Sequence, residues 1–166
     1  MRNVLMGALL LLASMLFTSL SMAAENEQIY GTWRLVGYTQ TDLASGQTTN
    51  VFGKTPHGLI TYGRDGRLSV LIVKEERPKP ASLGAMTDQD RAELFRGMIA
   101  YAGTYTFTAK TVTHNLEISW NHLWDGTSLT RNIKFDGRQL TLTTDPQPRA
   151  QDGKPVVAVL TWEKIE

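Results

Sequence analysis

The sequence predicts an all-β protein: an eight-stranded antiparallel up-and-down barrel with one short inserted helix. Two observations predict this class. Short runs rich in Thr, Val, Tyr, Trp and Leu recur along the chain, and turns that contain Gly or Asp separate them. Eight strands are enough to close a sheet on itself, which removes its exposed edges. The expected strands lie near residues 31–39, 57–63, 67–73, 102–108, 111–119, 127–135, 138–144 and 155–164.

Tight turns join several of these strands. Residues 64–66 (Arg-Asp-Gly) connect the second strand to the third, residues 109–110 (Ala-Lys) the fourth to the fifth, and residues 136–137 (Asp-Gly) the sixth to the seventh. Sequential hairpins of this kind build a meander. The stretch from Asp145 to Lys154 contains two prolines and is predicted to be a loop.

One segment departs from the strand pattern. Thr87 begins a Thr-Asp-Gln-Asp sequence that is typical of a helix start, and Leu94, Met98 and Tyr101 then recur at roughly helical spacing. We therefore expect a short helix over residues 90–100, inserted between the third and fourth strands. At one mouth of the barrel it would be either a lid over a cavity or a plug that completes the core.

Composition and charge exclude several classes of function. The 166 residues fit one domain, and 17 basic against 16 acidic side chains leave a net charge of only +1. That balance argues against nucleic acid as a partner, because phosphate neutralisation needs a basic surface. The chain has no Cys, so disulfides, thiolate metal sites and a cysteine nucleophile are excluded.

The first residues are typical of a secretory signal peptide. Arg2 precedes an apolar run over residues 4–17, and small residues follow up to Ala23 and Ala24. The apolar run is shorter than the roughly 20 residues that a membrane-spanning helix needs. We expect residues 1–23 to be the signal peptide and residues 24–166 the mature domain, without a membrane span after cleavage. The product would be secreted, and periplasmic in a Gram-negative bacterium.

Several stretches together resemble one protein family. They are GTWRLVGY from residue 31, PHGLITYGRDGRLSVLI from residue 56, AYAGTY from residue 100, TVTH from residue 111, LTL from residue 140 and VAVLTWE from residue 157. In this order they resemble the bacterial and fungal lipocalin-like domain family, a group of small calycin-type barrels, over residues 31–164. The resemblance implies a small barrel with a central pocket, and it implies no single activity. The family's usual Pro-Asn-Trp-x-Gly loop is replaced here by Asn-His-Leu-Trp-Asp-Gly at residues 121–126.

Strand alternation brings two cationic or polar side chains to an apolar face. In the fifth strand one face carries Val112, His114, Leu116, Ile118 and Trp120. In the sixth strand Arg131 shares a face with three apolar residues, Leu129, Ile133 and Phe135. Because these strands should be antiparallel neighbours, His114 and Arg131 are expected to look into the barrel together.

A buried guanidinium needs a partner, and two explanations stay open. In one, Arg131 and His114 hold a carboxylate, phenolate or enolate of an otherwise apolar ligand. In the other, Arg131 pairs with an internal acid or stacks on Trp33, and His114 is a satisfied core histidine. Aromatic residues are further candidates for ligand contacts. The full set of predicted ligand-binding residues is His114, Arg131, Tyr62, Tyr101, Tyr105, Trp120 and Trp124.

No metal site or cofactor is predicted. His57, His114 and His122 lack the short spacing of a metal-binding pair, and the chain has no nucleophile elbow, phosphate loop or dinucleotide glycine motif. Three functions remain. The first is a secreted carrier, monomer or homodimer, for a small hydrophobic or amphipathic ligand. The second is a cofactor-free isomerase or cyclase that uses His114 and Arg131 in the same pocket. The third is an envelope or stress factor that acts through an apolar outer surface.

Overall fold

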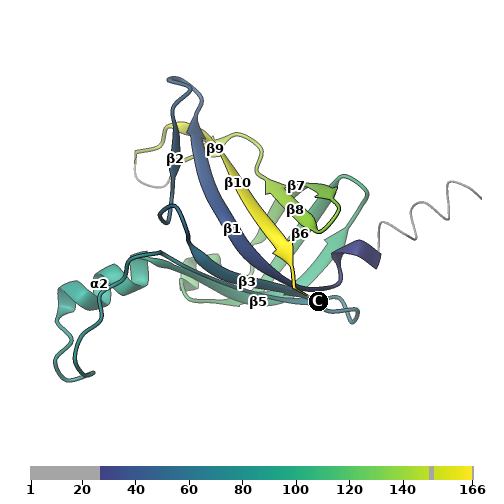
Figure 1. Cartoon of the computed structure of the whole chain (residues 1–166). Helices are drawn as coiled ribbons and strands as arrows, with labels where there is room; N and C mark the ends of the chain where they lie inside the picture. The colour runs from purple at the N-terminus through teal and green to yellow at the C-terminus, as the bar shows by residue number, and fades with distance from the viewer. Residues whose placement is uncertain (1–26, 150–151, 166) are drawn as a thin grey trace, which may run out of the picture.

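The computed structural model describes residues 27–149 and 152–165 (Figure 1). The predicted signal peptide, residues 1–23, lies outside the described residues. In chain order the elements are β1 (Gly31–Asp42), β2 (Thr48–Asn50), β3 (His57–Tyr62), β4 (Arg67–Val73), α2 (Asp88–Arg96), β5 (Met98–Phe107), β6 (Thr111–Ser119), the single 3-10 turn η1 (His122–Trp124), β7 (Ser128–Asp136), β8 (Gln139–Thr143), β9 (Gln147–Pro148) and β10 (Pro155–Lys164).

The sheet closes into the predicted eight-stranded barrel. Antiparallel neighbours follow the order β1-β3-β4-β5-β6-β7-β8-β10, and β10 pairs back onto β1 along almost its whole length. All eight predicted strands are confirmed. The short strands β2 and β9 were not predicted; β2 extends the β1 edge, and β9 pairs with β10 inside the segment that was predicted to be a loop.

The inserted helix is shorter than predicted. α2 begins at the predicted cap, where the Thr87 side chain and Asp90 hydrogen bond to each other's backbone N–H groups. It ends at Arg96, and β5 starts at Met98, opposite Val73 of β4. Met98 and Tyr101 therefore lie on a strand. Their backbone groups pair with β4 instead of with a helical turn, and the spacing of apolar residues in the sequence gave no sign of this pairing.

Two irregularities change which side chains face the interior. The register between β1 and β10 shifts between Leu35 and Gly37, and that between β5 and β6 shifts at Ala102 and Gly103. The second shift reverses the alternation in the last part of β6. Ile118, predicted to share a face with His114, is 64% exposed on the outside of the barrel, so that part of the prediction is wrong.

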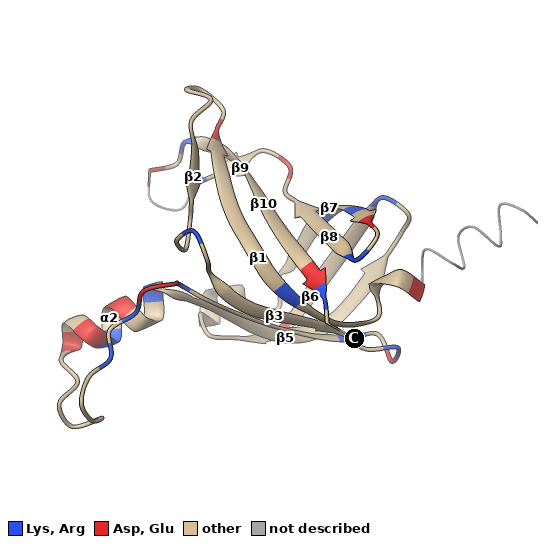
Figure 2. Ribbon diagram, viewed as in Figure 1, with Lys and Arg blue, Asp and Glu red and all other residues tan. Residues whose placement is uncertain are grey.

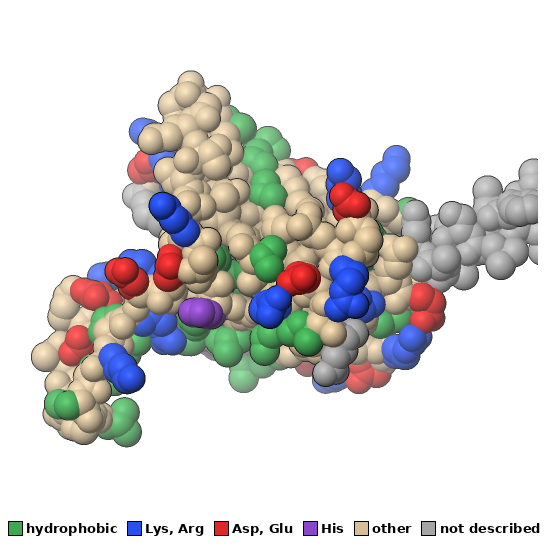
Figure 3. All heavy atoms as spheres, in the orientation of Figure 1, with side chains coloured by type: hydrophobic (Ala, Val, Ile, Leu, Met, Phe, Trp, Pro, Cys, Tyr) green, Lys and Arg blue, Asp and Glu red, His purple; other side chains and the backbone are tan. Residues whose placement is uncertain are grey.

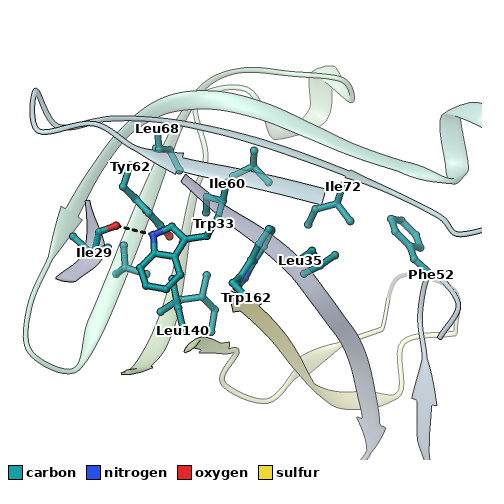
Figure 4. Close-up of a cluster of buried hydrophobic side chains, with 13 residues drawn as sticks. Ile29, Trp33, Leu35, Phe52, Ile60, Tyr62, Leu68, Ile72, Leu140 and Trp162 are labelled. Atoms are coloured by element: carbon teal, nitrogen blue, oxygen red, sulfur yellow. Dashed lines mark hydrogen bonds between the residues drawn. The ribbon is translucent and has the colours of Figure 1, made fainter. Parts of the chain in front are cut away.

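The core fills the closed end of the barrel. Figure 4 shows Trp33, Tyr62 and Trp162 among aliphatic side chains from β1, β3, β4 and β8, all pointing inward. The indole N–H of Trp33 donates to the Ile29 carbonyl oxygen at 2.9 Å, which ties the chain segment before β1 across this end. The cation over the Trp33 ring is Lys164, 5.1 Å from the ring centroid, rather than Arg131.

At the other end the strands separate. β1 and β2 rise on one side, while β3 and β5 run toward α2 on the other (Figure 1). None of the α2 residues is buried, and the helix extends away from the barrel. The plug alternative is therefore wrong. Charged residues concentrate on α2 and in the turns, while most of the barrel ribbon seen in this view carries other residues (Figure 2).

The barrel exterior carries exposed apolar side chains on neighbouring strands. Leu59 of β3 lies opposite Leu71 of β4, and the two are 46% and 48% exposed. Together with Ile118 of β6 they form what we call the outer apolar stripe. Figure 3 shows hydrophobic side chains gathered along the lower edge of this face, where β3 and β5 lie in Figure 1.

Replacing Gly103 by Ala is expected to destabilise the barrel. An added Cβ would overlap the backbone oxygen of Asn115 on β6, and a backbone atom cannot move aside as a side-chain tip can. We expect a loss of about 3 kcal/mol in unfolding free energy, measured by urea denaturation. Gly84→Ala, whose Cβ would have its nearest neighbour 3.9 Å away, is the control and should change little. Equal midpoints for the two variants would contradict the role given to the Gly103 bulge.

Candidate functional site

A cavity of about 360 Å³ lies inside the barrel and opens at the mouth. All eight strands of the barrel contribute to its wall, together with the residues that follow β2, β6, β8 and β9. Much of the wall is apolar. Its buried or half-buried aliphatic side chains include Ile60, Val70, Ile72, Leu142, Ala158 and Leu160.

Three of the polar side chains that line this cavity, Tyr101, His114 and Arg131, come from the neighbouring strands β5, β6 and β7. In the pairing of β6 with β7, His114 lies opposite Leu129, and Val112 lies opposite Arg131. His114 and Arg131 are therefore diagonal neighbours on the inner face of the two paired strands. Both line the cavity, as predicted from strand alternation.

His114 is held between two tyrosines. Its Nε2 is 2.7 Å from the hydroxyl of Tyr62, and its Nδ1 is 2.8 Å from the hydroxyl of Tyr101. The side chain is 1% exposed. Burial, with a smaller contribution from the positive charge of Arg131, lowers the pKa of His114 to about 3. The imidazole is consequently neutral at physiological pH, with one nitrogen that donates and one that accepts a hydrogen bond.

The neighbouring phenols are also protonated at physiological pH. Burial raises the pKa of Tyr62 and of Tyr101 above the ordinary value, and Arg131 offsets this in part. Tyr101 lines the cavity, whereas Tyr62 lies behind His114, away from the cavity wall. The arrangement is thus a chain of neutral hydrogen-bonding groups that leads from the packed core to the cavity.

Arg131 has no acidic partner in the described part of the chain. Its guanidinium is half-buried and donates to the carbonyl oxygen of Thr130 at 2.9 Å, and none of the ion pairs among residues 27–149 and 152–165 includes it. The internal acid that one explanation required is therefore absent from these residues. Such a cation on a cavity wall can pair with an anionic group brought by a ligand.

Two further arginines and one tyrosine of the wall were not predicted. Arg96 comes from the end of α2, Arg149 from the segment after β9, and Tyr38 from β1. Arg149 is already neutralised, since it pairs with Asp42 at 3.2 Å and with Asp152 at 2.7 Å. Arg96 and Arg149 lie beyond the ends of strands, so no alternation pattern could have placed them.

Trp120 and Trp124 stand on the wall next to Tyr101. Their ring centroids are 4.7 Å apart in an edge-to-face arrangement, and the Trp124 ring is 6.5 Å from that of Tyr101. The Trp120 indole N–H donates to the Phe95 carbonyl oxygen at 3.2 Å and so links the barrel to the last turn of α2. Both tryptophans thus line the cavity, and their role in ligand binding stays a prediction.

Of the seven predicted ligand-binding residues, five line the cavity: His114, Arg131, Tyr101, Trp120 and Trp124. Tyr62 and Tyr105 do not. Tyr105 donates its hydroxyl proton to the Gly63 carbonyl oxygen at 2.9 Å and faces a separate hollow of about 260 Å³ near Tyr30 and Arg64. Their rings pack edge to face behind His114, with centroids 4.9 Å apart.

Comparison with known families agrees with this geometry. The lipocalin-like domain family matches residues 30–165, which is nearly the whole described chain. The protein belongs to this family. The match covers the closed barrel and every residue of its cavity, and it is compatible with binding of a small ligand by this lipocalin-like barrel. No curated protein matches the chain.

Residues 27–149 and 152–165 meet neither the requirements of a metal site nor those of a membrane-spanning helix. These residues contain no group of three or more His, Asp and Glu side chains that could hold a metal ion. Neither α2 nor the other helical turns there have the length and apolar character to cross a membrane.

The neutral state of His114 predicts a pH-dependent stability. In the unfolded chain this imidazole should titrate near its ordinary pKa of about 6.5, whereas folding lowers its pKa to about 3. Between these values the unfolded state binds a proton that the folded state does not. The stabilising contribution is therefore complete above pH 6.5 and is lost as the pH falls toward 3, by up to about 1.4 kcal/mol per pH unit.

Denaturation between pH 7 and 4.5 measures this effect before most carboxylates titrate. The wild type should lose stability over that window, and His114→Gln, although less stable, should show a flatter profile. His57→Gln is the control, because His57 is exposed at the start of β3, and it should keep the wild-type slope. A wild-type slope in His114→Gln would contradict the assignment.

Proposed function

We propose that the protein is an exported binding protein that holds a small hydrophobic or amphipathic molecule inside its barrel. One observation carries this proposal: a cavity of about 360 Å³ opens at the mouth, with aliphatic and aromatic walls and a few convergent polar side chains. Small-molecule sites commonly have this composition, and the volume falls at the lower end of the usual range of about 300–1,000 Å³. A compact ligand fits it best.

Binding would draw on two contributions. Burial of the ligand's apolar surface against the wall contributes about 25 cal/mol for each Å² removed from water. The polar side chains on β5, β6 and β7 would fix the ligand's orientation. Because the tyrosines hold both nitrogens of His114, the hydroxyl of Tyr101 is the end of this group that meets a ligand.

The same geometry bears on the isomerase hypothesis. A general base has to reach the proton that it removes, and the imidazole of His114 is enclosed by Tyr62 and Tyr101. An acid or base acting on a bound molecule would therefore be Tyr101. We favour the carrier, since its requirements are a cavity and orienting groups only.

The proposed location is outside the cytoplasm. It is supported by the signal-peptide pattern of residues 1–23 and by the lack of Cys, which suits an oxidising compartment. Expression of the full chain in a Gram-negative host should release a periplasmic product that begins at Ala24 or Glu25, as N-terminal mass analysis would show. Retention of Met1 on cytoplasmic protein would contradict this location.

Blocking the cavity should abolish binding of an apolar probe. In β7 the side chain of Leu129 faces the cavity, whereas that of the next residue, Thr130, is exposed on the outside. We expect the uncharged probe N-phenyl-1-naphthylamine to gain fluorescence on the wild type and on Thr130→Trp. Leu129→Trp should weaken its binding about tenfold or more, because the indole occupies the space of the probe. Circular dichroism checks that both variants fold.

Unchanged binding by Leu129→Trp would move the site out of the barrel. The outer apolar stripe of Leu59, Leu71 and Ile118 would then become the candidate, in agreement with the hypothesis of a factor that acts through its surface. Replacement of Leu71 by Ser would in that case remove the probe signal, and it should not do so if the barrel holds the ligand.

A further inference from the structure

The cavity wall presents side chains with N–H groups that have no acceptor among the described residues. Arg131 is the first. Its guanidinium has five N–H groups, and among the described residues its side chain makes one hydrogen bond, to the Thr130 carbonyl oxygen at the strand itself. Arg131 lines the cavity, and the described residues of that lining include no Asp or Glu that could accept from its remaining N–H groups.

Trp162 is the second. Its side chain is on the same wall and is 1% exposed, and its indole Nε1 has no hydrogen-bond partner among the described residues. A buried N–H without an acceptor costs on the order of 1–3 kcal/mol, which is why such groups are rare in folded proteins. On a cavity wall, a ligand oxygen can relieve that cost.

The third donor follows from the proton count around His114. The neutral imidazole can accept one hydrogen bond and donate one. Within the described chain, the buried hydroxyl of Tyr62 has His114 as its hydrogen-bond partner and no other. If Nε2 carried the proton, the Tyr62 hydroxyl would accept from it, and its own O–H would be left buried without an acceptor.

The lower-cost arrangement places the proton on Nδ1. Tyr62 then donates to Nε2 at 2.7 Å, and the Nδ1–H group donates to the oxygen of Tyr101 at 2.8 Å. In this arrangement the two donors that flank the imidazole contacts, the Tyr62 hydroxyl and the Nδ1–H group, each have an acceptor. The Tyr101 O–H is released from the imidazole, and since Tyr101 lines the cavity, this O–H can donate to a ligand.

The charge around the cavity is positive, which favours a ligand group that accepts hydrogen bonds and carries a negative charge. Arg149 is compensated by Asp42 and Asp152, whereas Arg131 and Arg96 form no ion pair within residues 27–149 and 152–165. The other polar side chains of the wall include the neutral amides of Gln40 and Gln147. The wall therefore combines two uncompensated positive charges with an apolar surface.

We propose that the cavity selects amphipathic carboxylic acids, whose carboxylate accepts from Arg131 and from the Tyr101 hydroxyl while the apolar body packs against the aliphatic wall. His114 and Tyr62 are positioning residues: they orient the Tyr101 O–H, and their own hydrogen bonds leave neither imidazole nitrogen free for the ligand. This inference rests on the proposed function, because it specifies the ligand of the same barrel. An amine or an ammonium head finds positive charge there and is rejected.

A displacement series tests the choice of head group. Decanoate, decanol and decylamine share one apolar body, and each can compete at pH 7.5 with bound N-phenyl-1-naphthylamine. Decanoate should displace the probe at a concentration about tenfold or more below that of decanol, since charge-assisted hydrogen bonds are the stronger ones. Decylamine should be the weakest of the three.

Two variants with matched controls locate the head group. Arg131→Met should bring decanoate to the level of decanol, whereas Lys134→Met, which removes a positive charge from the outward face of the same strand, should leave the preference unchanged. Tyr101→Phe should reduce the preference for decanoate several-fold. Tyr30→Phe, which removes a hydroxyl outside this cavity, should not.

The outcomes separate the two proposals. Saturable probe binding with equal displacement by all three compounds overturns the carboxylate inference and leaves the barrel as a binding site. Tighter binding of decylamine overturns it as well. Failure of the wild type to bind the probe or any of the three compounds overturns the proposed function and, with it, this inference.

The role of His114 has its own readout. In a ¹⁵N-labelled sample, long-range ¹H–¹⁵N spectra distinguish which imidazole nitrogen carries the proton. We expect the Nδ1-protonated tautomer for His114, unchanged between pH 7.5 and 5. If Nε2 carried the proton instead, Nδ1 would accept a hydrogen bond from the Tyr101 hydroxyl, and that O–H would not be free for a ligand. This result would overturn the positioning role.

Discussion

Pairing of β10 with β1 is the constraint on which the rest of the molecule depends. It turns an open meander into a closed wall, so that the inner faces of all eight strands meet around one interior. The closed end is filled by Trp33, Tyr62 and Trp162, and the opposite end keeps a cavity. Without this closure, His114 and Arg131 would stand on an exposed sheet face, where water would satisfy them and little selectivity would follow.

Enclosure changes the chemistry of the polar groups that it surrounds. On an open surface an imidazole, a phenol and a guanidinium exchange hydrogen bonds with water at little cost, but in a closed barrel each has to find a partner. His114 hydrogen bonds to two tyrosines and is neutral because burial lowers its pKa, while Arg131 donates to a single carbonyl oxygen. Because the hydrogen bonds of His114 are complete and those of Arg131 are not, the cavity wall carries a positive charge with free donors.

The strand pattern alone predicted the fold, because alternation and turn chemistry are local properties of a chain. It also placed His114 and Arg131 correctly on the inner face, since β6 is regular as far as Leu116 and β7 is regular throughout. It failed where a bulge interrupts a strand. Tyr38 reaches the cavity because the register shift between Leu35 and Gly37 moves the inward face from odd to even positions.

A glycine inside a strand is the available signal for such a bulge, and both Gly37 and Gly103 lie at one. No such signal predicts that Arg96 lines the cavity, because its position depends on how the chain returns from α2 to the barrel. The hydrogen bonds of His114 could not be derived either. They join residues 13 and 52 positions apart, and only the register of β3 through β6 brings these together.

The segment between β4 and β5 is built as an appendage. The Lys74 N–H donates to the Gly97 carbonyl oxygen at 2.9 Å, so the two strands are clamped together at the base of the insertion. Residues 76–94 beyond this clamp carry little of the barrel's packing, and lengthening a loop whose ends are already held adds little entropic cost. Evolution can therefore exchange this segment for one of another length or sequence, and a protein engineer can graft an epitope there, while the barrel behind it keeps its shape.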